Sequence, residues 1–263
     1  MLIDDDLIQR VAARLREAQT SATPVAPIRD ELAAGGVDAA YAVQEANTRH
    51  ALASGRRIVG RKIGLTSKAV QQQLGVDSPD FGMLFADMAV PDGGEVPRGK
   101  VLQAKAEAEM AFVMQRDLDD PELTLFDVAA AVECVHPAIE IVGSRIRDWN
   151  IKLLDTIADN ASSGMFVLGE ARRTLAGLDL AACTMTMTRR GEAVSSGSGA
   201  ACLGNPLNAA LWLAHRMVKV GRPLRAGDVV MSGALGPMVA VEPGDALEAR
   251  IEGLGSVRVA FAA

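Results

Sequence analysis

The stretch "KAEAEMAFVM" at residues 105–114 decides the fold, because two backbone geometries compete for it. Its Ala, Glu, Lys and Met residues favour a helix, in which residues two apart face in nearly opposite directions. In a strand, residues two apart share one face, so Glu107 and Glu109 would point together. The other face would then carry only apolar side chains, namely Ala108, Met110, Phe112 and Met114. This apolar face fits a core-facing strand, and we therefore predict a strand here.

A third carboxylate, Glu140, stands alone among Ile and Val in "HPAIEIVGS" at residues 136–144. A lone ionised acid in such a strand needs a partner, and two acids on one strand face repel unless water or a cation compensates. A solvated acidic face on an edge strand is the simpler interpretation, whereas an enclosed face favours a bound cation. Three carboxylates suit Mg²⁺ or Mn²⁺ better than zinc. Glu107, Glu109 and Glu140 are therefore candidate ligands of such an ion.

The elements around these strands predict an α+β fold. Apolar periodicity predicts helices at residues 4–20, 39–56 and 205–221, the last with Asn205 as its cap. Further helices are expected at 67–76 and at 123–135, where Thr124 and Asp127 are spaced like a capping box. Short strands joined by Gly-containing turns are expected elsewhere, at 57–67, 80–90, 137–146, 184–197, 228–241 and 246–261. We thus expect a helical N-terminal region over 1–56 and a β-rich domain over 57–263.

Composition excludes several classes of protein. The net charge is −6, aromatic residues make up 3%, and no basic run occurs, which argues against nucleic-acid binding. Cys134, Cys183 and Cys202 are too far apart for a disulfide framework or a cysteine-ligated zinc site. No long apolar span occurs and the first residues are acidic, so we expect neither a membrane span nor a signal peptide, and a cytoplasmic location. No dinucleotide-binding or P-loop motif is present.

Five blocks of sequence, in this order, resemble the 2-keto-4-pentenoate hydratases of the fumarylacetoacetate hydrolase superfamily. They are "GRKIGLTSKAVQQQLGVDSPDFGMLFADM" (60–88), "AEAEMAFV" (106–113), "PAIEIVGSRIRDW" (137–149), "DTIADNASSG" (155–164) and "SGALGPMVAV" (232–241). The resemblance implies a β-rich roll of the fumarylacetoacetase C-terminal-domain type with a metal site in its mouth. It implies that the three glutamates bind the metal. Lys105 with Ala106, and His136, depart from the family pattern without touching the three ligands.

The resemblance also implies an activity: the addition of water to a 2-hydroxypenta-2,4-dienoate to give 4-hydroxy-2-oxopentanoate, in the breakdown of aromatic compounds by meta-cleavage. It implies catalytic roles for Lys62 and Asp80. Lys62 would either clamp the substrate carboxylate as a cation or carry protons as a neutral amine, and the sequence leaves both roles open. Candidate substrate-binding or supporting residues are Asp159, Asn160, Ser162 and Ser232. A homo-oligomer is expected, as is association with a decarboxylase of the same pathway.

Three other functions compete with this one. A sister enzyme, 2-oxo-3-hexenedioate (4-oxalocrotonate) decarboxylase, would share the fold and the metal site but needs a second cationic anchor for its dicarboxylate. Hydrolysis of an acylpyruvate would need a base such as a His–Glu pair, whereas His50 and His215 lie in helical stretches, where packing or solvation is the simpler role. A catalytically silent scaffold subunit is disfavoured because the three glutamates and Lys62 are all present.

Overall fold

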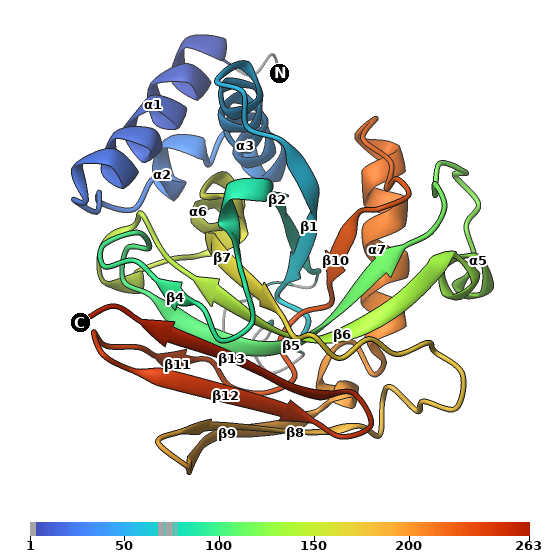
Figure 1. The fold of residues 1–263 in the computed structure, drawn as a ribbon. Coiled ribbons are helices and arrows are strands. Elements are labelled where there is room, and N and C mark those ends of the chain that lie inside the picture. The colour runs from blue at the N-terminus through green and yellow to red at the C-terminus, as the bar shows by residue number, and fades with distance from the viewer. Residues whose placement is uncertain (1–3, 68–70, 72–75, 77) are drawn as a thin grey trace.

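The computed structural model describes residues 4–67, 71, 76 and 78–263, and it confirms the α+β class. The N-terminal region contains α1 (Asp5–Ser21), α2 (Arg29–Leu32) and α3 (Gly36–Ala53), which lie together on one side of the molecule in Figure 1. Both long helices were predicted. The short α2 was not predicted. The helix predicted at 67–76 falls largely outside the described residues.

The larger sheet has eight strands, in the order β2-β1-β10-β5-β6-β7-β3, with β11 paired to β5. The strands are β1 (Ile58–Gly64), β2 (Asp80–Phe85), β3 (Ala89–Val90), β5 (Lys105–Met114), β6 (Val132–Val142), β7 (Ser163–Leu168), β10 (Val229–Met231) and β11 (Val239–Ala240). Figure 1 shows β5 and β6 as long curved strands through the centre of the molecule. The strand predicted at residues 105–114 is therefore confirmed, and it occupies the middle of the sheet.

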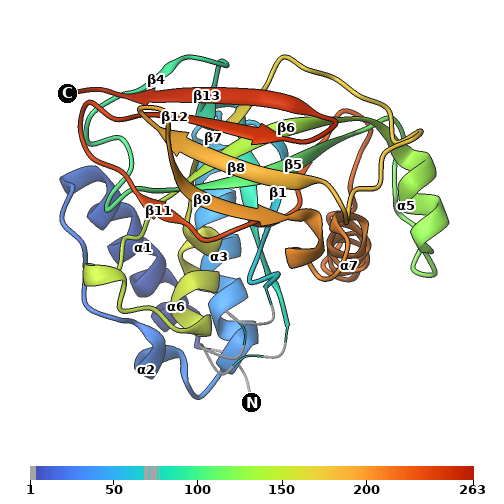
Figure 2. The ribbon, with the colours of Figure 1, turned by 90° about the horizontal axis from the view of Figure 1, so that it is seen from below.

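A second sheet of five strands has the order β4-β13-β12-β8-β9. Its strands are β4 (Glu95–Val96), β8 (Thr184–Arg189), β9 (Glu192–Ser198), β12 (Ala246–Ile251) and β13 (Gly255–Phe261). Seen from below in Figure 2, this sheet lies across β5 and β6, on the side opposite the N-terminal helices. The central strands are therefore covered on both faces, which explains why both faces of β5 are largely buried.

Two predicted helix caps are confirmed. In α7 (Pro206–Lys219) the Asn205 side chain accepts a hydrogen bond from the Leu207 N–H. In α5 (Leu125–Ala131) Thr124 and Asp127 form the capping box. The predicted end of α5 was wrong, because the chain turns into β6 at Val132 rather than after Pro137. The strand continues through Pro137 because its carbonyl still accepts a hydrogen bond, from the Gly169 N–H at 2.8 Å.

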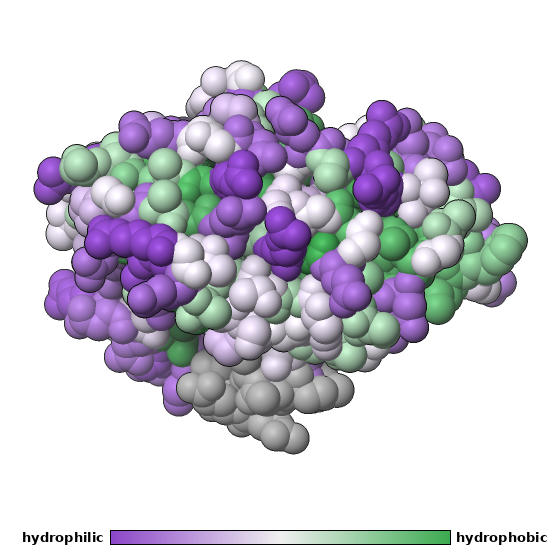
Figure 3. Space-filling model, turned by 60° about the horizontal axis from the view of Figure 1, so that its bottom comes forward, coloured by the Kyte–Doolittle hydropathy of each residue, from purple (hydrophilic) through white to green (hydrophobic). Residues whose placement is uncertain are grey.

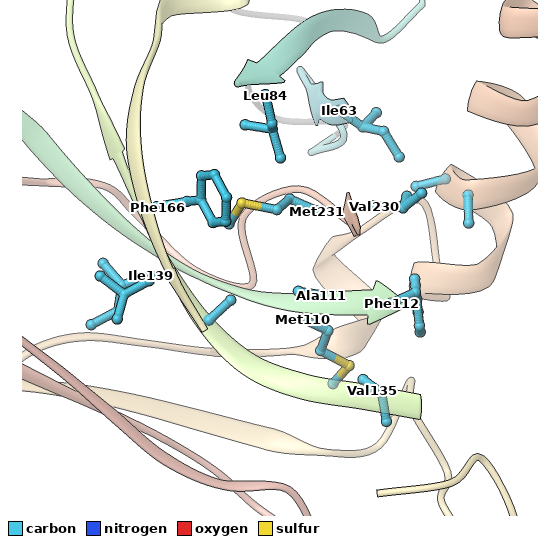
Figure 4. Close-up of a cluster of buried hydrophobic side chains, with 14 of the residues drawn as sticks. Ile63, Leu84, Met110, Ala111, Phe112, Val135, Ile139, Phe166, Val230 and Met231 are labelled. Atoms are coloured by element: carbon cyan, nitrogen blue, oxygen red, sulfur yellow. The ribbon is translucent and has the colours of Figure 1, made fainter. Parts of the chain in front are cut away.

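The main hydrophobic core draws on strands of both sheets. Figure 4 shows side chains from β1, β2, β5, β6, β7 and β10 gathered in this cluster, and they include Ile63, Leu84, Met110, Phe112, Ile139, Phe166 and Met231. All of these are at most 3% exposed. This core fixes the relative positions of the strands that carry the polar residues described below.

A second hydrophobic cluster joins the N-terminal helices to α6 (Leu153–Ala158), with Ile157 packed among residues of α1 and α3. The buried Gln44 of α3 also donates hydrogen bonds to the carbonyls of Phe81 and Ile157, at 2.8 and 2.9 Å. The helical region thus shares its core with an element of the β-rich part. The division of the chain at residue 56 stays a prediction.

The surface is mixed in polarity. On the face shown in Figure 3, hydrophilic and hydrophobic residues are interspersed. Among the residues that the structure describes, no helix combines the length and the apolar character needed to cross a bilayer.

Candidate metal centre

Three carboxylates meet on the two central strands. Glu107 of β5 is paired directly with Glu140 of β6, and Glu109 lies two residues further along β5 on the same face. One carboxylate oxygen from each residue can be chosen so that all three lie within 4.8 Å of one another. Glu109 and Glu140 are fully buried, whereas Glu107 is partly exposed. The strand register therefore brings together the three residues predicted as ligands.

The cluster has too few hydrogen-bond donors for its charge. Glu109 Oε2 accepts the Gly233 N–H at 2.9 Å, and Glu140 Oε2 lies 3.2 Å from Lys62 Nζ in an ion pair. Glu109 Oε1 and both oxygens of Glu140 are buried without a hydrogen-bond partner. Buried acceptors without partners are costly, and an all-oxygen donor set suits a hard divalent cation. The residues present therefore fit Mg²⁺ or Mn²⁺.

Burial raises the pKa of each acid in the cluster. Burial, followed by the neighbouring carboxylates of Glu140 and Glu107, raises the pKa of Glu109 well above its usual range. Burial also raises the pKa of Glu140 to about 7, although Lys62 opposes this change. The pKa of Glu107 is raised for the same first reason. Without a cation, the folded protein therefore disfavours three ionised carboxylates here.

We expect metal-free protein to lose stability as pH rises from about 4.5 to about 7. In this interval the folded state keeps a proton on Glu140 that the unfolded chain has released. The folded state then binds more protons, so its stability falls with rising pH. The change should be roughly 3 kcal/mol, at 1.36 kcal/mol for each pKa unit. Denaturant unfolding in chelator at several pH values measures it, with Glu140→Gln expected to flatten the slope. An equal slope in that variant would contradict the assignment.

The two predicted catalytic residues lie beside the cluster on adjacent strands. Lys62 of β1 is 3% exposed and donates to the Ala161 carbonyl at 2.9 Å. Burial alone would lower the pKa of Lys62, but the carboxylates of Glu140 and then Asp80 outweigh it and raise the pKa. Lys62 is therefore a cation in this arrangement. This favours binding of the substrate carboxylate over proton transfer by a neutral amine.

Asp80 begins β2 and is 1% exposed. Its Oδ2 accepts a hydrogen bond from Thr156 Oγ1 at 3.2 Å, whereas Oδ1 is buried with no hydrogen-bond partner. Burial raises the pKa of Asp80, and Lys62 opposes that change. A carboxyl group with one unengaged oxygen beside the cavity can accept and donate a proton.

A cavity of about 110 Å³ adjoins these groups. Lys62, Asp80, Glu107, Thr156 and Ser162 form its polar wall. Apolar residues form the rest, and they include Leu65, Val142, Trp149, Ile151 and Met238. Among the described lining residues, Lys62 is the only basic one. The cavity thus offers one cation and a largely apolar surface to a small molecule.

The structure does not bring every predicted substrate-binding residue to this cavity. Ser162 lines it, but Asp159 and Asn160 line a separate groove of about 440 Å³ beside the N-terminal helices. Asp159 is paired with the buried Arg145. The Ser232 hydroxyl is fully buried and bonds to backbone groups of Met110 and Gly233. Contact of Asp159, Asn160 or Ser232 with substrate stays a prediction.

Two residues of the site were missed from the sequence. Gly233 has φ +102°, and a Cβ there would lie 2.3 Å from Thr66 Oγ1, so only glycine can present this N–H to Glu109. Trp149 forms part of the cavity wall, with its ring 4.3 Å from Lys105 Nζ and its Nε1–H bonded to the Gln103 carbonyl. The glycine pair in "SGALG" and the scarcity of tryptophan were the available signals.

The histidines are accounted for by other contacts. His136 Nδ1 bonds to the Gly169 carbonyl at 2.9 Å, and His215 Nε2 bonds to the Leu123 carbonyl at 2.8 Å. His50 lines the groove beside the N-terminal helices. None of the three histidines, all within the described part of the chain, lines the cavity at Lys62. A His–Glu pair for hydrolysis is therefore not formed at this site.

The chain is similar to a known protein family and to curated proteins over most of its length. The family model for the fumarylacetoacetate (FAA) hydrolase C-terminal domain matches residues 40–262. "2-Keto-4-pentenoate hydratase 2" of Dechloromonas aromatica is 59% identical over 254 residues, which cover 97% of each chain. The "TodF product hydratase" of Pseudomonas putida is 58% identical over 255 residues, or 97% of this chain and 95% of the relative.

One solved structure resembles the whole chain. The 4-oxalocrotonate decarboxylase from Pseudomonas putida G7, complexed with magnesium and adipate, superposes with a TM-score of 0.94. It is 35% identical, and the match covers 99% of both chains. The predicted roll, preceded by a helical region, is therefore confirmed.

Proposed function

Because the chain belongs to the fumarylacetoacetate hydrolase family, we propose that it is a hydro-lyase that adds water to 2-hydroxypenta-2,4-dienoate and releases 4-hydroxy-2-oxopentanoate. One observation carries this proposal. Three carboxylates meet beside a small, largely apolar cavity lined by Glu107, Lys62 and Asp80, and the other two, Glu109 and Glu140, have buried oxygens without a hydrogen-bond partner. The names of two relatives at 58–59% identity support hydration as the reaction.

Glu107, Glu109 and Glu140 would hold the divalent metal, Mg²⁺ or Mn²⁺, through their carboxylate oxygens. When bound, the metal supplies Lewis-acid stabilisation of negative charge at the substrate's 2-oxygen. The solved decarboxylase of the same fold is complexed with magnesium and adipate, which supports a divalent ion as the cofactor. All the remaining chemistry can be assigned to side chains of this chain.

Lys62 binds the substrate carboxylate through an N–H that the Ala161 carbonyl does not engage. Asp80 moves the protons through Oδ1. The 2-hydroxyl proton leaves and C5 gains one, which gives an α,β-unsaturated 2-oxo acid. Water then adds its oxygen to C4 and a proton to C3. The apolar wall around Trp149 and Met238 keeps bulk water from the hydrocarbon end of the substrate.

The cavity favours a monocarboxylate over the dicarboxylate of the sister decarboxylase. Lys62 is the only basic residue among the described lining residues, and it lies beside the glutamates. Among the residues that the structure describes, the apolar lining, which includes Val142, Ile151 and Met238, offers no charge to a second carboxylate. Burial of an unpaired carboxylate there would be costly. Decarboxylation is thus the second candidate function, supported by the structural neighbour rather than by the cavity.

We expect freshly prepared 2-hydroxypenta-2,4-dienoate to be consumed in the presence of Mg²⁺ or Mn²⁺ and to give 4-hydroxy-2-oxopentanoate. Loss of the dienol absorbance measures the rate, and mass spectrometry identifies the product. Removal of metal by chelator should slow turnover on the order of 10³-fold, because Lewis-acid stabilisation contributes several kcal/mol. A parallel assay with 2-oxo-3-hexenedioate should release little CO₂. CO₂ release without any hydration of the dienoate would overturn the proposal.

Assembly is part of the same proposal. We expect a homo-oligomer that associates with the decarboxylase of its pathway, and light scattering of each protein alone and of the mixture would test both points.

A further inference from the structure

The turn at residues 160–162 contacts Lys62 and has a strained backbone. Asn160, Ala161 and Ser162 have φ values of 54°, 50° and 58°, and none of them is glycine. The left-handed region is sterically unfavourable for residues that carry a Cβ, and such residues seldom occur in succession. Strain of this kind persists only where surrounding contacts impose it, and it is concentrated at functional sites. The contacts that impose this turn are therefore informative.

The side chain of Asn160 imposes the turn by pairing with a strand edge. β2 is an edge strand of the larger sheet. Asn160 Oδ1 accepts the Met83 N–H at 2.7 Å, and Asn160 Nδ2 donates to the Met83 carbonyl at 3.0 Å. The carboxamide thus takes the place of a neighbouring strand. The fit is close, because a Cβ at Gly82 would lie 2.3 Å from the Asn160 carbonyl oxygen.

The turn at residues 160–162 places one backbone group, the Ala161 carbonyl, against Lys62. The Ala161 carbonyl accepts a hydrogen bond from Lys62 Nζ at 2.9 Å, and Glu140 Oε2 lies 3.2 Å from the same nitrogen. Gly82 of β2 precedes Met83, and it is paired with Lys62 of the adjacent strand β1. An ammonium group has three N–H donors. The hydrogen bond to Ala161 and the attraction of the Glu140 carboxylate therefore restrict the direction of the remaining donors, on a side chain that otherwise has four flexible bonds.

We propose that Asn160 is a positioning residue that acts through Lys62: its pairing with Met83 holds the 160–162 turn, and the Ala161 carbonyl then orients the Lys62 ammonium toward the substrate. This role rests on the proposed function, in which Lys62 binds the substrate carboxylate. It differs from the substrate contact expected from the sequence, since Asn160 lines the groove on the other side of the turn.

The test is a double-mutant cycle on the metal-loaded full chain. Asn160→Ala should lower kcat about 10- to 100-fold, the range typical of residues that orient a functional group, with KM changed less than about threefold. In a Lys62→Met background, the same Asn160→Ala change should have no further effect, because its target is gone. Equal loss in both backgrounds, or an unchanged kcat, would overturn the proposal.

Further variants separate positioning from folding. Asn160→Asp keeps the acceptor for the Met83 N–H and loses only the donor, so its loss of kcat should be smaller than that of Asn160→Ala. Asn160→Gly relieves the backbone strain at residue 160 but does not restore the hydrogen bonds to Met83. It should therefore be more stable than Asn160→Ala and have an equally low kcat. As a matched control, Thr124→Ala removes the cap of α5 and should lower Tm without lowering kcat.

If the wild-type chain does not hydrate the dienoate, a crystal structure of Asn160→Ala still tests whether Asn160 positions Lys62. Such inactivity would refute the proposed function alone. The structure should then still show Lys62 Nζ displaced from the Ala161 carbonyl. An unmoved turn and an unmoved Lys62 would refute the positioning role, whatever the activity.

Discussion

Glu109→Gln is expected to lower kcat/KM by about 10³-fold or more and to abolish the rise of Tm with added Mg²⁺ or Mn²⁺. Glutamine keeps the size of the side chain and an oxygen acceptor for the Gly233 N–H, but it removes the charge that binds the cation. The expected loss corresponds to the several kcal/mol that a metal contributes as a Lewis acid. Steady-state kinetics and thermal unfolding, with and without metal, measure the two effects.

The same variant has an opposite effect on metal-free protein. The three neighbouring carboxylates repel one another, and the charges of Glu140 and Glu107 contribute to the raised pKa of Glu109. The neutral amide relieves that repulsion, so metal-free Glu109→Gln should be at least as stable as metal-free wild type at pH 8. Glu95→Gln, an exposed change on β4, is the matched control and should alter neither property. Normal turnover by Glu109→Gln would remove the basis of the metal proposal.

Lys62→Met is expected to lower kcat/KM about 10³-fold, within the range for a group that transfers protons or fixes a developing charge. The change leaves Glu140 buried without its ion-pair partner, and loss of one partner of a buried pair typically costs about 3–5 kcal/mol. Added Mg²⁺ should restore part of this stability but not the activity. Kinetics and denaturant unfolding measure the two consequences separately.

Lys62→Arg distinguishes the two roles left open for Lys62. An arginine stays charged at every working pH, so a carboxylate clamp would keep part of its function, whereas a proton carrier would lose it. Lys219→Met, at the exposed end of α7, is the control and should be as active as wild type. Activity of Lys62→Met within about tenfold of wild type would show that this residue has neither role.

The sequence was sufficient for the strand that carries the site, and for a physical reason. Helix propensity favoured the wrong geometry at residues 105–114, but propensity is a weak prior that burial overrides. Alternation placed apolar residues on one face of β5 and two acids on the other, and only a strand satisfies that pattern. The caps at Thr124 and Asn205 were equally local and were confirmed.

Features that depend on tertiary contacts could not be predicted. The register that sets Glu107 opposite Glu140 is determined by strand pairing, not by either strand alone. The left-handed turn at 160–162 contains no glycine, the residue that usually indicates such a backbone conformation. Asn160 was predicted as a substrate-binding or supporting residue, and the pairing of its side chain with the backbone of Met83 could not be predicted from the sequence.

The central claim is that Glu107, Glu109 and Glu140 bind one divalent cation, and anomalous diffraction from crystals grown with Mn²⁺ tests it most directly. The account predicts a single strong anomalous peak per chain, at coordinating distance (roughly 2.0–2.3 Å) from an oxygen of each of the three carboxylates. A fully active, Mn²⁺-loaded enzyme whose only anomalous peak lies away from these three side chains would contradict it.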